Sequence, residues 1–190
     1  AAAAAAPPAS TTSAPSSSLR RPALHAEPVV ASLRGLYGME VADLRSGAPV
    51  SLARYAGRPL LVVNTASRCG FADETHAALN ELHAWYAADG LAVLAFPSDD
   101  FDQEPGSADE IASFASDKGA AFETFGKLSV GGAAAHPLYE ALTAASGSAV
   151  RWNYESFLLS REGALLEHWG AGTPLTAPPQ IVAVEAALRA

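Results

Sequence analysis

The stretch Pro59-Leu60-Leu61-Val62-Val63-Asn64-Thr65 is a continuous apolar run that ends in two polar residues. Such a run is typical of a strand that is buried on both faces of a sheet. Residues 72–88 follow with apolar side chains at helical spacing, and residues 91–96 form a second apolar run. A strand, a helix and a strand within about 35 residues predict a right-handed βαβ unit with two parallel strands.

Further elements are expected on both sides of this unit. Two hairpins are predicted, with their strands at residues 38–44, 48–51, 157–160 and 164–167. Three more helices are predicted, at residues 107–116, 137–145 and 181–190. Ser107 and Glu110 fit a capping box at the start of the first of these helices. Together the elements predict an α/β protein with a thioredoxin-like fold, in which helices flank both faces of a central mixed sheet.

The composition indicates one soluble domain of ordinary size, which we place at residues 29–190. The chain has 190 residues, 49% of them hydrophobic, and no apolar run approaches the roughly 18 residues that a membrane span requires. Its formal net charge is −8, and its 12 Lys and Arg residues are dispersed along the sequence. Nucleic acid is therefore not expected as a partner.

Residues 1–28 differ in composition from the rest of the chain. They are rich in Ala, Ser and Pro, and no acidic residue precedes Glu27. Such a segment cannot bury enough apolar surface to offset the entropy of ordering, so one interpretation is a disordered low-complexity tail. An Arg-bearing and acid-poor composition is also typical of organellar targeting segments, so a targeting remnant is the other interpretation. The compartment stays open between an organelle, the cytoplasm and export.

Cys69 is the only cysteine of the chain and lies where the predicted strand gives way to the helix. A helix N-terminus offers unpaired backbone N–H groups and positive charge, which favour a thiolate at Cys69. The turn that contains Cys69 is expected to be half-exposed. The alternative is that Cys69 packs as a small hydrophobic residue. With one cysteine no intramolecular disulfide can form, and Cys69-Gly70-Phe71-Ala72 lacks the second thiol of a Cys-x-x-Cys motif. A dithiol oxidoreductase is therefore excluded.

Three separated segments resemble the glutathione peroxidase family in their order and spacing. They are Val63-Asn64-Thr65-Ala66-Ser67-Arg68-Cys69-Gly70-Phe71, then Leu94-Ala95-Phe96-Pro97-Ser98-Asp99-Asp100-Phe101 with Gln103-Glu104-Pro105-Gly106, and Arg151-Trp152-Asn153-Tyr154-Glu155-Ser156-Phe157-Leu158. The likeness extends from Leu36 to the C-terminus. It implies an enzyme, a thiol peroxidase that reduces hydrogen peroxide and organic or lipid hydroperoxides.

The resemblance also implies which residues carry the chemistry. Cys69 would be the nucleophile, which peroxide oxidises to a cysteine sulfenic acid. Trp152 and Asn153 are neutral donors that can stabilise the thiolate and the alkoxide leaving from the broken O–O bond. Outside the family context, a Trp is more often a packing residue.

The second segment departs from the family pattern at Asp100, which takes the position of the family's catalytic Gln. An ionised carboxylate cannot donate to a thiolate and repels it. Asp100 is therefore expected to be protonated, to point away, or to accept a proton when peroxide attacks. The segment is also one residue shorter after Phe101 than the commonest version, so Gln103 could supply the amide instead.

A second departure concerns the resolving cysteine of many non-animal family members. Ser98 and the stretch Phe114-Ala115-Ser116-Asp117 occupy positions where such a cysteine occurs, and neither contains a thiol. The sulfenic acid at Cys69 would have to be reduced by an external thiol, glutathione or thioredoxin, and no cofactor is expected. The segment between Tyr139 and Trp152 lacks the insertion through which tetrameric relatives assemble, so the resemblance implies a monomer.

Other constellations are weaker. A Cys-His hydrolase would need an imidazole beside Cys69, and His76 is about 10 Å further along the helix. The acidic residues at positions 100–104 begin like a calcium loop, but Pro105 stands where Gly is needed, so no metal is expected. The five histidines are expected at the surface. A peroxide sensor or a non-catalytic thioredoxin-like binding protein, for which Cys69 oxidation is a signal, is the alternative to an enzyme.

Overall fold

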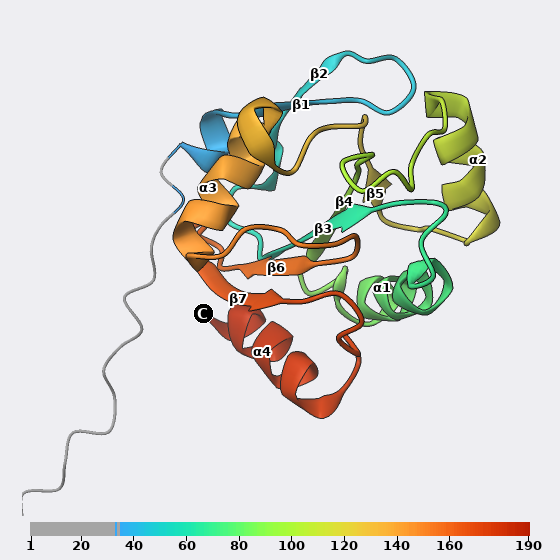
Figure 1. Ribbon diagram of the computed structural model, residues 1–190. Helices are drawn as coiled ribbons and strands as arrows, with labels where there is room; N and C mark the ends of the chain where they lie inside the picture. The colour runs from blue at the N-terminus through green and yellow to red at the C-terminus, as the bar shows by residue number, and fades with distance from the viewer. Residues whose placement is uncertain (1–32, 34) are drawn as a thin grey trace, which may run out of the picture.

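The computed structural model describes residue 33 and residues 35–190, so the predicted tail and the domain boundary at residue 29 lie outside the described residues. Figure 1 shows a central sheet with helices on either side. Its five strands run in the order β5-β4-β3-β6-β7. They are β3 (Leu60–Thr65), β4 (Ala92–Pro97), β5 (Glu123–Thr124), β6 (Ser156–Leu159) and β7 (Leu165–Trp169).

The sheet is mixed, as the sequence predicts. β3 pairs with β4 in parallel, in a register that sets Leu60 opposite Ala92, and helix α1 (Ala72–Tyr86) connects the two strands. β5 continues the parallel part beside β4, whereas β6 pairs antiparallel with β3, and β7 pairs antiparallel with β6. The predicted βαβ unit and the predicted second hairpin are thereby confirmed.

Helices cover both faces of the sheet (Figure 1). Helices α1 and α4 (Pro178–Arg189) pack on one face, where Leu79 and Val184 join Leu61 of β3 in one hydrophobic core. Helix α3 (Pro137–Ser146) lies on the other face and contributes to a second core. Every residue of β3 and β4 is buried because both faces are covered.

Short elements complete the fold. Strands β1 (Glu40–Ala42) and β2 (Pro49–Ser51) pair antiparallel and confirm the first hairpin. Helix α2 (Ala108–Asp117) begins after Ser107, which forms both hydrogen bonds of the predicted capping box with Glu110. The remaining helical segments are 3₁₀ turns: η1 (Leu36–Gly38), η2 (Leu52–Tyr55) and η3 (Gly132–Ala134).

Three features differ from the sequence-based expectation. The sequence does not predict β5, because two residues, one of them charged, carry no periodicity. Helix α4 begins at Pro178 and not at residue 181, since a proline fits the first helical turn, where its missing N–H would have no partner. Helix α1 ends at Tyr86, and Gly90 follows after a further turn with a positive φ of 112°.

The topology brings three loops to one edge of the sheet. β3 and β4 are parallel, so both end at this edge, where Thr65 lies opposite Pro97. β6 runs the other way and begins at the same edge, with Ser156 opposite Val63. The loops after β3 and β4 and the loop before β6 therefore meet, and they carry the thiol and the other predicted site residues.

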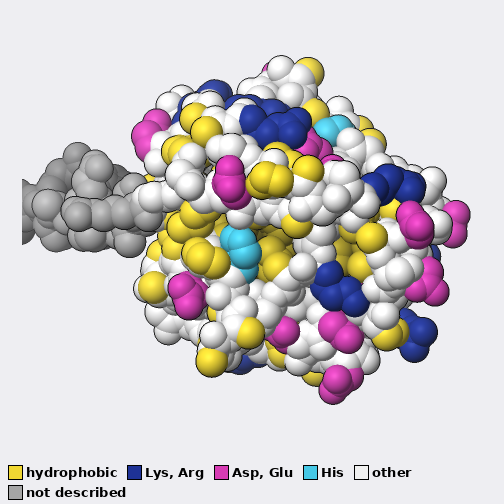
Figure 2. Space-filling model, turned by 90° about the horizontal axis from the view of Figure 1, so that it is seen from above, with side chains coloured by type: hydrophobic (Ala, Val, Ile, Leu, Met, Phe, Trp, Pro, Cys, Tyr) yellow, Lys and Arg dark blue, Asp and Glu magenta, His cyan; other side chains and the backbone are white. Residues whose placement is uncertain are grey.

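The described residues contain no helix that is both long and apolar enough to cross a membrane. On the face drawn in Figure 2, Lys and Arg side chains are interspersed with Asp and Glu side chains. On that face, the charges that are dispersed along the sequence are also dispersed in space.

Candidate active site

The thiol of Cys69 lies in the short segment between β3 and α1. Its exposed fraction is only 6%, so the thiol itself is buried, although its neighbours Arg68 and Gly70 are exposed and the turn as a whole is half-exposed, as expected. The Cys69 N–H donates to Ala66 O over 3.3 Å, and Cys69 O accepts from the N–H of Ala72 over 3.0 Å. Since Ala72 is the first residue of α1, Cys69 precedes the helix by three residues, with its backbone bonded into the entry turn.

A buried carboxylate holds the residues just before the thiol. Glu104 has an exposed fraction of 1%, and its two oxygens accept hydrogen bonds from Ser67 N–H over 2.7 Å and from Ser67 Oγ over 2.8 Å. Lys127 Nζ donates to the backbone oxygen of Glu104 over 2.6 Å and brings a positive charge to the same segment. These contacts offset the cost of burying the carboxylate and fix the turn that carries Cys69.

Gln103 connects the thiol segment to the loop before β6. Its backbone oxygen accepts from the N–H of Arg68, the neighbour of Cys69, over 3.0 Å. Its side-chain Oε1 accepts from Asn153 Nδ2 over 2.9 Å. One residue thus contacts both the segment of the thiol and a predicted site residue.

Asn153 and Trp152 differ in exposure although they are adjacent. Asn153 is fully buried, and its Oδ1 has no hydrogen-bond partner among the described residues. Trp152 is 40% exposed, and its ring lies against Phe101 with a centroid separation of 5.4 Å. Buried polar atoms are rarely left unpaired, and a role in chemistry is one physical reason for an exception such as Asn153 Oδ1.

Tyr154 links the same loop to the thiol segment from another side. Its hydroxyl donates to Ala66 O over 2.8 Å, and its backbone adopts a left-handed conformation with a φ of 67°. Burial raises the pKa of the Tyr154 phenol well above its usual value, so the hydroxyl stays a neutral donor. A left-handed backbone is unusual for a residue with a bulky side chain and persists only where the surrounding contacts hold it.

Asp100 faces a different part of the molecule. It is exposed, and its Oδ2 accepts hydrogen bonds from Ser129 Oγ, Val130 N–H and Gly131 N–H at 2.9, 2.6 and 3.0 Å. The carboxylate is thus engaged with residues 129–131. Of the three expectations for Asp100, this arrangement agrees with the one in which its carboxylate points away from the thiol.

Comparison with known proteins assigns the chain to a family. A family model described as glutathione peroxidase matches residues 36–143, more than half of the chain. The chain belongs to the glutathione peroxidase family. The predicted resemblance is confirmed, and with it the prediction of a peroxidase, an oxidoreductase that acts on hydroperoxides.

Two curated relatives and one solved structure illustrate the match to other glutathione peroxidases. The chain is 41% identical over 138 residues to the phospholipid hydroperoxide glutathione peroxidase, chloroplastic, of Pisum sativum, and the match covers 70% of this chain and 57% of that protein. It is 38% identical over 160 residues to the hydroperoxy fatty acid reductase gpx1 of Synechocystis sp., with 78% of this chain and 92% of that protein covered. It also resembles the crystal structure of T. cruzi GPX1, with 30% identity, a TM-score of 0.64, and coverage of 81% of this chain and 96% of that chain. The predicted fold class is thereby confirmed.

Within this glutathione peroxidase fold, His76 is buried, so the expectation that all five histidines lie at the surface is wrong. Its ring packs against Phe114, Phe122 and Tyr154 with centroid separations of 5.2, 5.9 and 5.8 Å, and its Nδ1 lies 2.9 Å from Ala72 O. Burial lowers the pKa of His76, so its imidazole is neutral at neutral pH. Among the described residues, no group of three or more His, Cys, Asp or Glu side chains is placed to hold a metal ion.

Sequence reasoning missed three residues whose hydrogen bonds hold the candidate site together. Glu104 and Glu155 are acidic and Tyr154 is aromatic, so in the sequence they resemble ordinary surface or packing residues. The available signal is their position, because each lies inside a segment that resembles a family signature.

Two surface cavities lie beside the site and share the lining residues 130–132. The nearer cavity, of about 360 Å³, is also lined by Asp100, Phe101 and Val150. The second, of about 520 Å³, adjoins it and is also lined by residues of α3 and by Ala149. Small and apolar side chains prevail in both, and because the two cavities share three lining residues we call them together the groove. Phe101, which lines the nearer cavity, connects the groove with Trp152 of the site.

Proposed function

We propose that this glutathione peroxidase reduces hydroperoxides through a sulfenic acid at Cys69. The observation that carries the proposal is the position of the thiol. Cys69 is buried, and both Glu104 and Gln103 bond to the turn that contains it. Gln103 also connects this turn to Asn153. The Cys69 thiolate attacks one peroxide oxygen, the O–O bond breaks, and the sulfur is oxidised to the sulfenic acid. The alkoxide, or hydroxide when the substrate is hydrogen peroxide, takes up a proton and leaves.

Amide and indole N–H groups stabilise the negative charges of this step. Gln103 supplies the amide that the family pattern has as a Gln at position 100. Asn153 Nδ2 donates to Gln103 Oε1, and Asn153 Oδ1 is left unpaired. If both side-chain amides are rotated by 180°, the bond between them is kept, but Gln103 becomes the donor and Asn153 the acceptor. The unpaired group of Asn153 is then Nδ2 and no longer Oδ1. That amide and the Trp152 indole are donors for the thiolate and the departing oxygen. Neutral donors suit this task better than the Asp100 carboxylate, which cannot donate when it is ionised.

An external thiol reduces the sulfenic acid in this proposal. A first thiol condenses with the S–OH group, which releases water and forms a mixed disulfide. A second thiol attacks this mixed disulfide, so that the two external sulfurs leave as a disulfide and the Cys69 thiol is restored. Glutathione and thioredoxin are the two candidates, because Cys69 is the sole cysteine and has no partner thiol within the chain. We also propose that the protein is a monomer, and light scattering on the purified protein tests this.

Replacement of the thiol tests the proposed function directly. Cys69→Ser removes the nucleophile with little change in volume, so peroxide consumption with either reductant should fall below about 1% of wild type at an unchanged thermal midpoint. Trp152→Phe and Asn153→Ala should each slow the peroxide step by about ten- to a thousandfold. Turnover that survives in Cys69→Ser would refute the assignment of the reaction to this thiol. A single oxidation without turnover in the wild type would favour the peroxide sensor.

The proposed substrates are hydrogen peroxide and organic or lipid hydroperoxides. The names of two relatives refer to a phospholipid hydroperoxide and to a hydroperoxy fatty acid. In this chain, the groove along residues 130–132 offers small and apolar walls beside the site. An acyl chain placed there would leave water, which favours binding by about 0.8 kcal/mol per buried CH₂ group.

Ala149→Asp tests this substrate range. Ala149 is exposed and lines the larger cavity, so a carboxylate there should raise KM for a fatty acid hydroperoxide by about tenfold and leave the rate with hydrogen peroxide unchanged. Ala88→Asp, at an exposed turn that follows α1 on the opposite face of the sheet, is the matched control. Equal effects of the two variants on both substrates would exclude the groove as the binding place of the acyl chain.

A further inference from the structure

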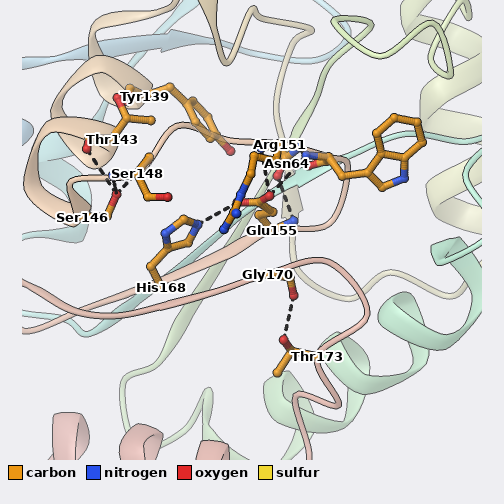
Figure 3. Close-up of polar contacts among 11 residues, drawn as sticks. Asn64, Tyr139, Thr143, Ser146, Ser148, Arg151, Glu155, His168, Gly170 and Thr173 are labelled. Atoms are coloured by element: carbon orange, nitrogen blue, oxygen red, sulfur yellow. Dashed lines mark hydrogen bonds and ion pairs between the residues drawn. The ribbon is translucent and has the colours of Figure 1, made fainter.

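A second buried carboxylate holds the loop that carries Trp152 and Asn153 (Figure 3). Glu155 is 2% exposed, and its Oε1 accepts the backbone N–H groups of Arg151 over 2.9 Å and of Trp152 over 3.2 Å. Its Oε2 lies 2.8 Å from Nε2 of His168 on β7. Both carboxylate oxygens are therefore bonded, one to the loop and one to a strand of the sheet.

Asn64, near the end of β3, completes the support from the other side. Its Nδ2 donates to Trp152 O over 3.0 Å, its Oδ1 accepts from Glu155 N–H over 3.0 Å, and its backbone oxygen accepts from Tyr154 N–H over 2.7 Å. Hydrogen bonds thus fix the backbone directly before and directly after Asn153. The same bonds support the left-handed conformation of Tyr154.

His168 is placed to satisfy the second oxygen of the Glu155 carboxylate. The His168 side chain is 12% exposed, and its ring is stacked on Phe157 with a centroid distance of 4.1 Å and an interplanar angle of 9°. An ionised carboxylate only accepts, so His168 Nε2 must carry the proton of their bond. Without this donor, one oxygen of a buried carboxylate would lack a partner, at a high desolvation cost.

We infer that Glu155 and His168 are positioning residues, which hold Trp152 and Asn153 in the geometry that the reaction at Cys69 requires. This inference rests on the proposed function. The two side chains bond to the loop backbone and to each other, so they act through Trp152 and Asn153. Because a preorganised donor stabilises developing charge better than a mobile one, a loosened loop should slow peroxide reduction.

A carboxylate suits this place over a wide pH range. Histidine carries a proton on Nε2 in its cationic form and in one neutral form, and a carboxylate oxygen accepts from either. The side chains drawn around the pair in Figure 3 from β3 and α3 include Asn64 and Tyr139, and burial raises the pKa of Tyr139 so that its phenol is uncharged. The flanking charged residues, Arg151 and Glu167, are exposed.

Glu155→Gln separates this role from a merely structural one. In this variant, the amide oxygen of residue 155 can accept from the loop N–H groups while the amide nitrogen donates to neutral His168. When His168 is protonated, its Nε2–H faces the amide N–H, so two donors meet and the bond is lost. Relative to wild type at the same pH, oxidation of Cys69 by hydrogen peroxide should stay within about threefold at about pH 8.5 and fall at least about tenfold at about pH 5.0. Backbone hydrogen exchange at Arg151 and Trp152 should exceed the wild-type rate only at the lower pH.

Two further variants serve as rescue and control. Glu155→Gln combined with His168→Gln pairs two amides and contains no titrating ring, so the loss at low pH should disappear. Glu167→Gln removes an exposed carboxylate one residue from His168 and outside the hydrogen-bonded loop, so it should match wild type at both pH values.

The inference is overturned if Glu155→Gln keeps the same rate relative to wild type at both pH values, or if exchange accelerates without slower oxidation. If this variant does not fold, His168→Leu and His168→Gln take its place. The Leu variant strands Glu155 Oε2 and should slow Cys69 oxidation about tenfold more than the Gln variant, and equal rates would also overturn the inference. Failure of the proposed function is recognised separately, because wild-type Cys69 would then react with peroxide no faster than a free thiol.

Discussion

Asp100 and Glu104 stand close together in the loop after β4, and both carboxylates accept backbone N–H groups, yet they hold different parts of the molecule. Asp100 is exposed and bonds to residues 129–131 beside the surface cavities. Glu104 is 1% exposed and bonds to Ser67, two residues before the thiol. The acid of this loop that bonds to the thiol segment is therefore the buried Glu104, and not Asp100, which takes the position of the family's catalytic Gln.

The two carboxylates should also differ in what they contribute to stability. Water can replace the carboxylate of Asp100 at its exposed position, whereas it reaches the buried position of the Glu104 carboxylate less easily, so the donors of Ser67 would lose their acceptor there. Removal of Glu104 should therefore destabilise the fold far more than removal of Asp100.

Glu104→Ala should have the largest effect. It leaves Ser67 N–H and Oγ without their buried acceptor, so we expect the free energy of unfolding to fall by about 3 kcal/mol. Oxidation of Cys69 by hydrogen peroxide should slow by more than about tenfold, because the turn that carries the thiol is released. Urea denaturation followed by tryptophan fluorescence measures the stability, with the exposed Glu81→Ala as control. A loss below about 1 kcal/mol would show that water replaces the carboxylate and would weaken the contrast with Asp100.

Gln103→Ala should lower the stability less than Glu104→Ala does, but it should clearly slow the oxidation of Cys69. The Asn153 amide loses its fixed partner, so Cys69 oxidation should slow by about ten- to a hundredfold while the free energy of unfolding falls by about 1 kcal/mol. Gln103→Glu sharpens the test, since a carboxylate still accepts from Asn153 and cannot donate when it is ionised. Stopped-flow measurement of thiol loss gives both rates. A wild-type rate in Gln103→Ala would remove Gln103 from the site.

Asp100→Asn should have the smallest effect. The Asn amide oxygen can still accept from residues 129–131, and water can reach the exposed position. The rate of Cys69 oxidation should therefore stay within about threefold of wild type, and the free energy of unfolding should change by less than about 1 kcal/mol. The same thiol titration and urea denaturation apply. A tenfold change of rate in either direction would mean that residue 100 acts on the sulfur, and the contrast between the two acids would no longer hold.

Much of the fold follows from local sequence signals. The continuous apolar runs of β3 and β4 predict buried parallel strands, and Ser107 with Glu110 predicts the start of α2 through a bond that needs no tertiary contact. Strand β5 is different, because only its pairing with Leu94 and Ala95 of β4 makes these two residues a strand. A local pattern cannot predict an element that tertiary contacts define.

The candidate site divides in the same way. The thiol, the indole and the amide stand in segments that resemble family signatures, so the meeting of these segments at one edge of the sheet could be predicted. The contacts of Glu104 and Glu155 could not, since acidic side chains are normally exposed. Their burial depends on partners that are distant in sequence, Ser67 and His168.

Tyr154, with its φ of 67°, limits how the Trp152–Asn153 loop can be transplanted. A bulky residue in this conformation costs about 1 kcal/mol or more, and here Asn64 and Glu155 supply bonds that offset the cost. A designer who grafts only residues 151–154 onto another thioredoxin-like scaffold would import the strain without its support. The transferable unit is the loop together with the end of β3 and the buried glutamate, a discontinuous module that no single stretch of sequence encodes.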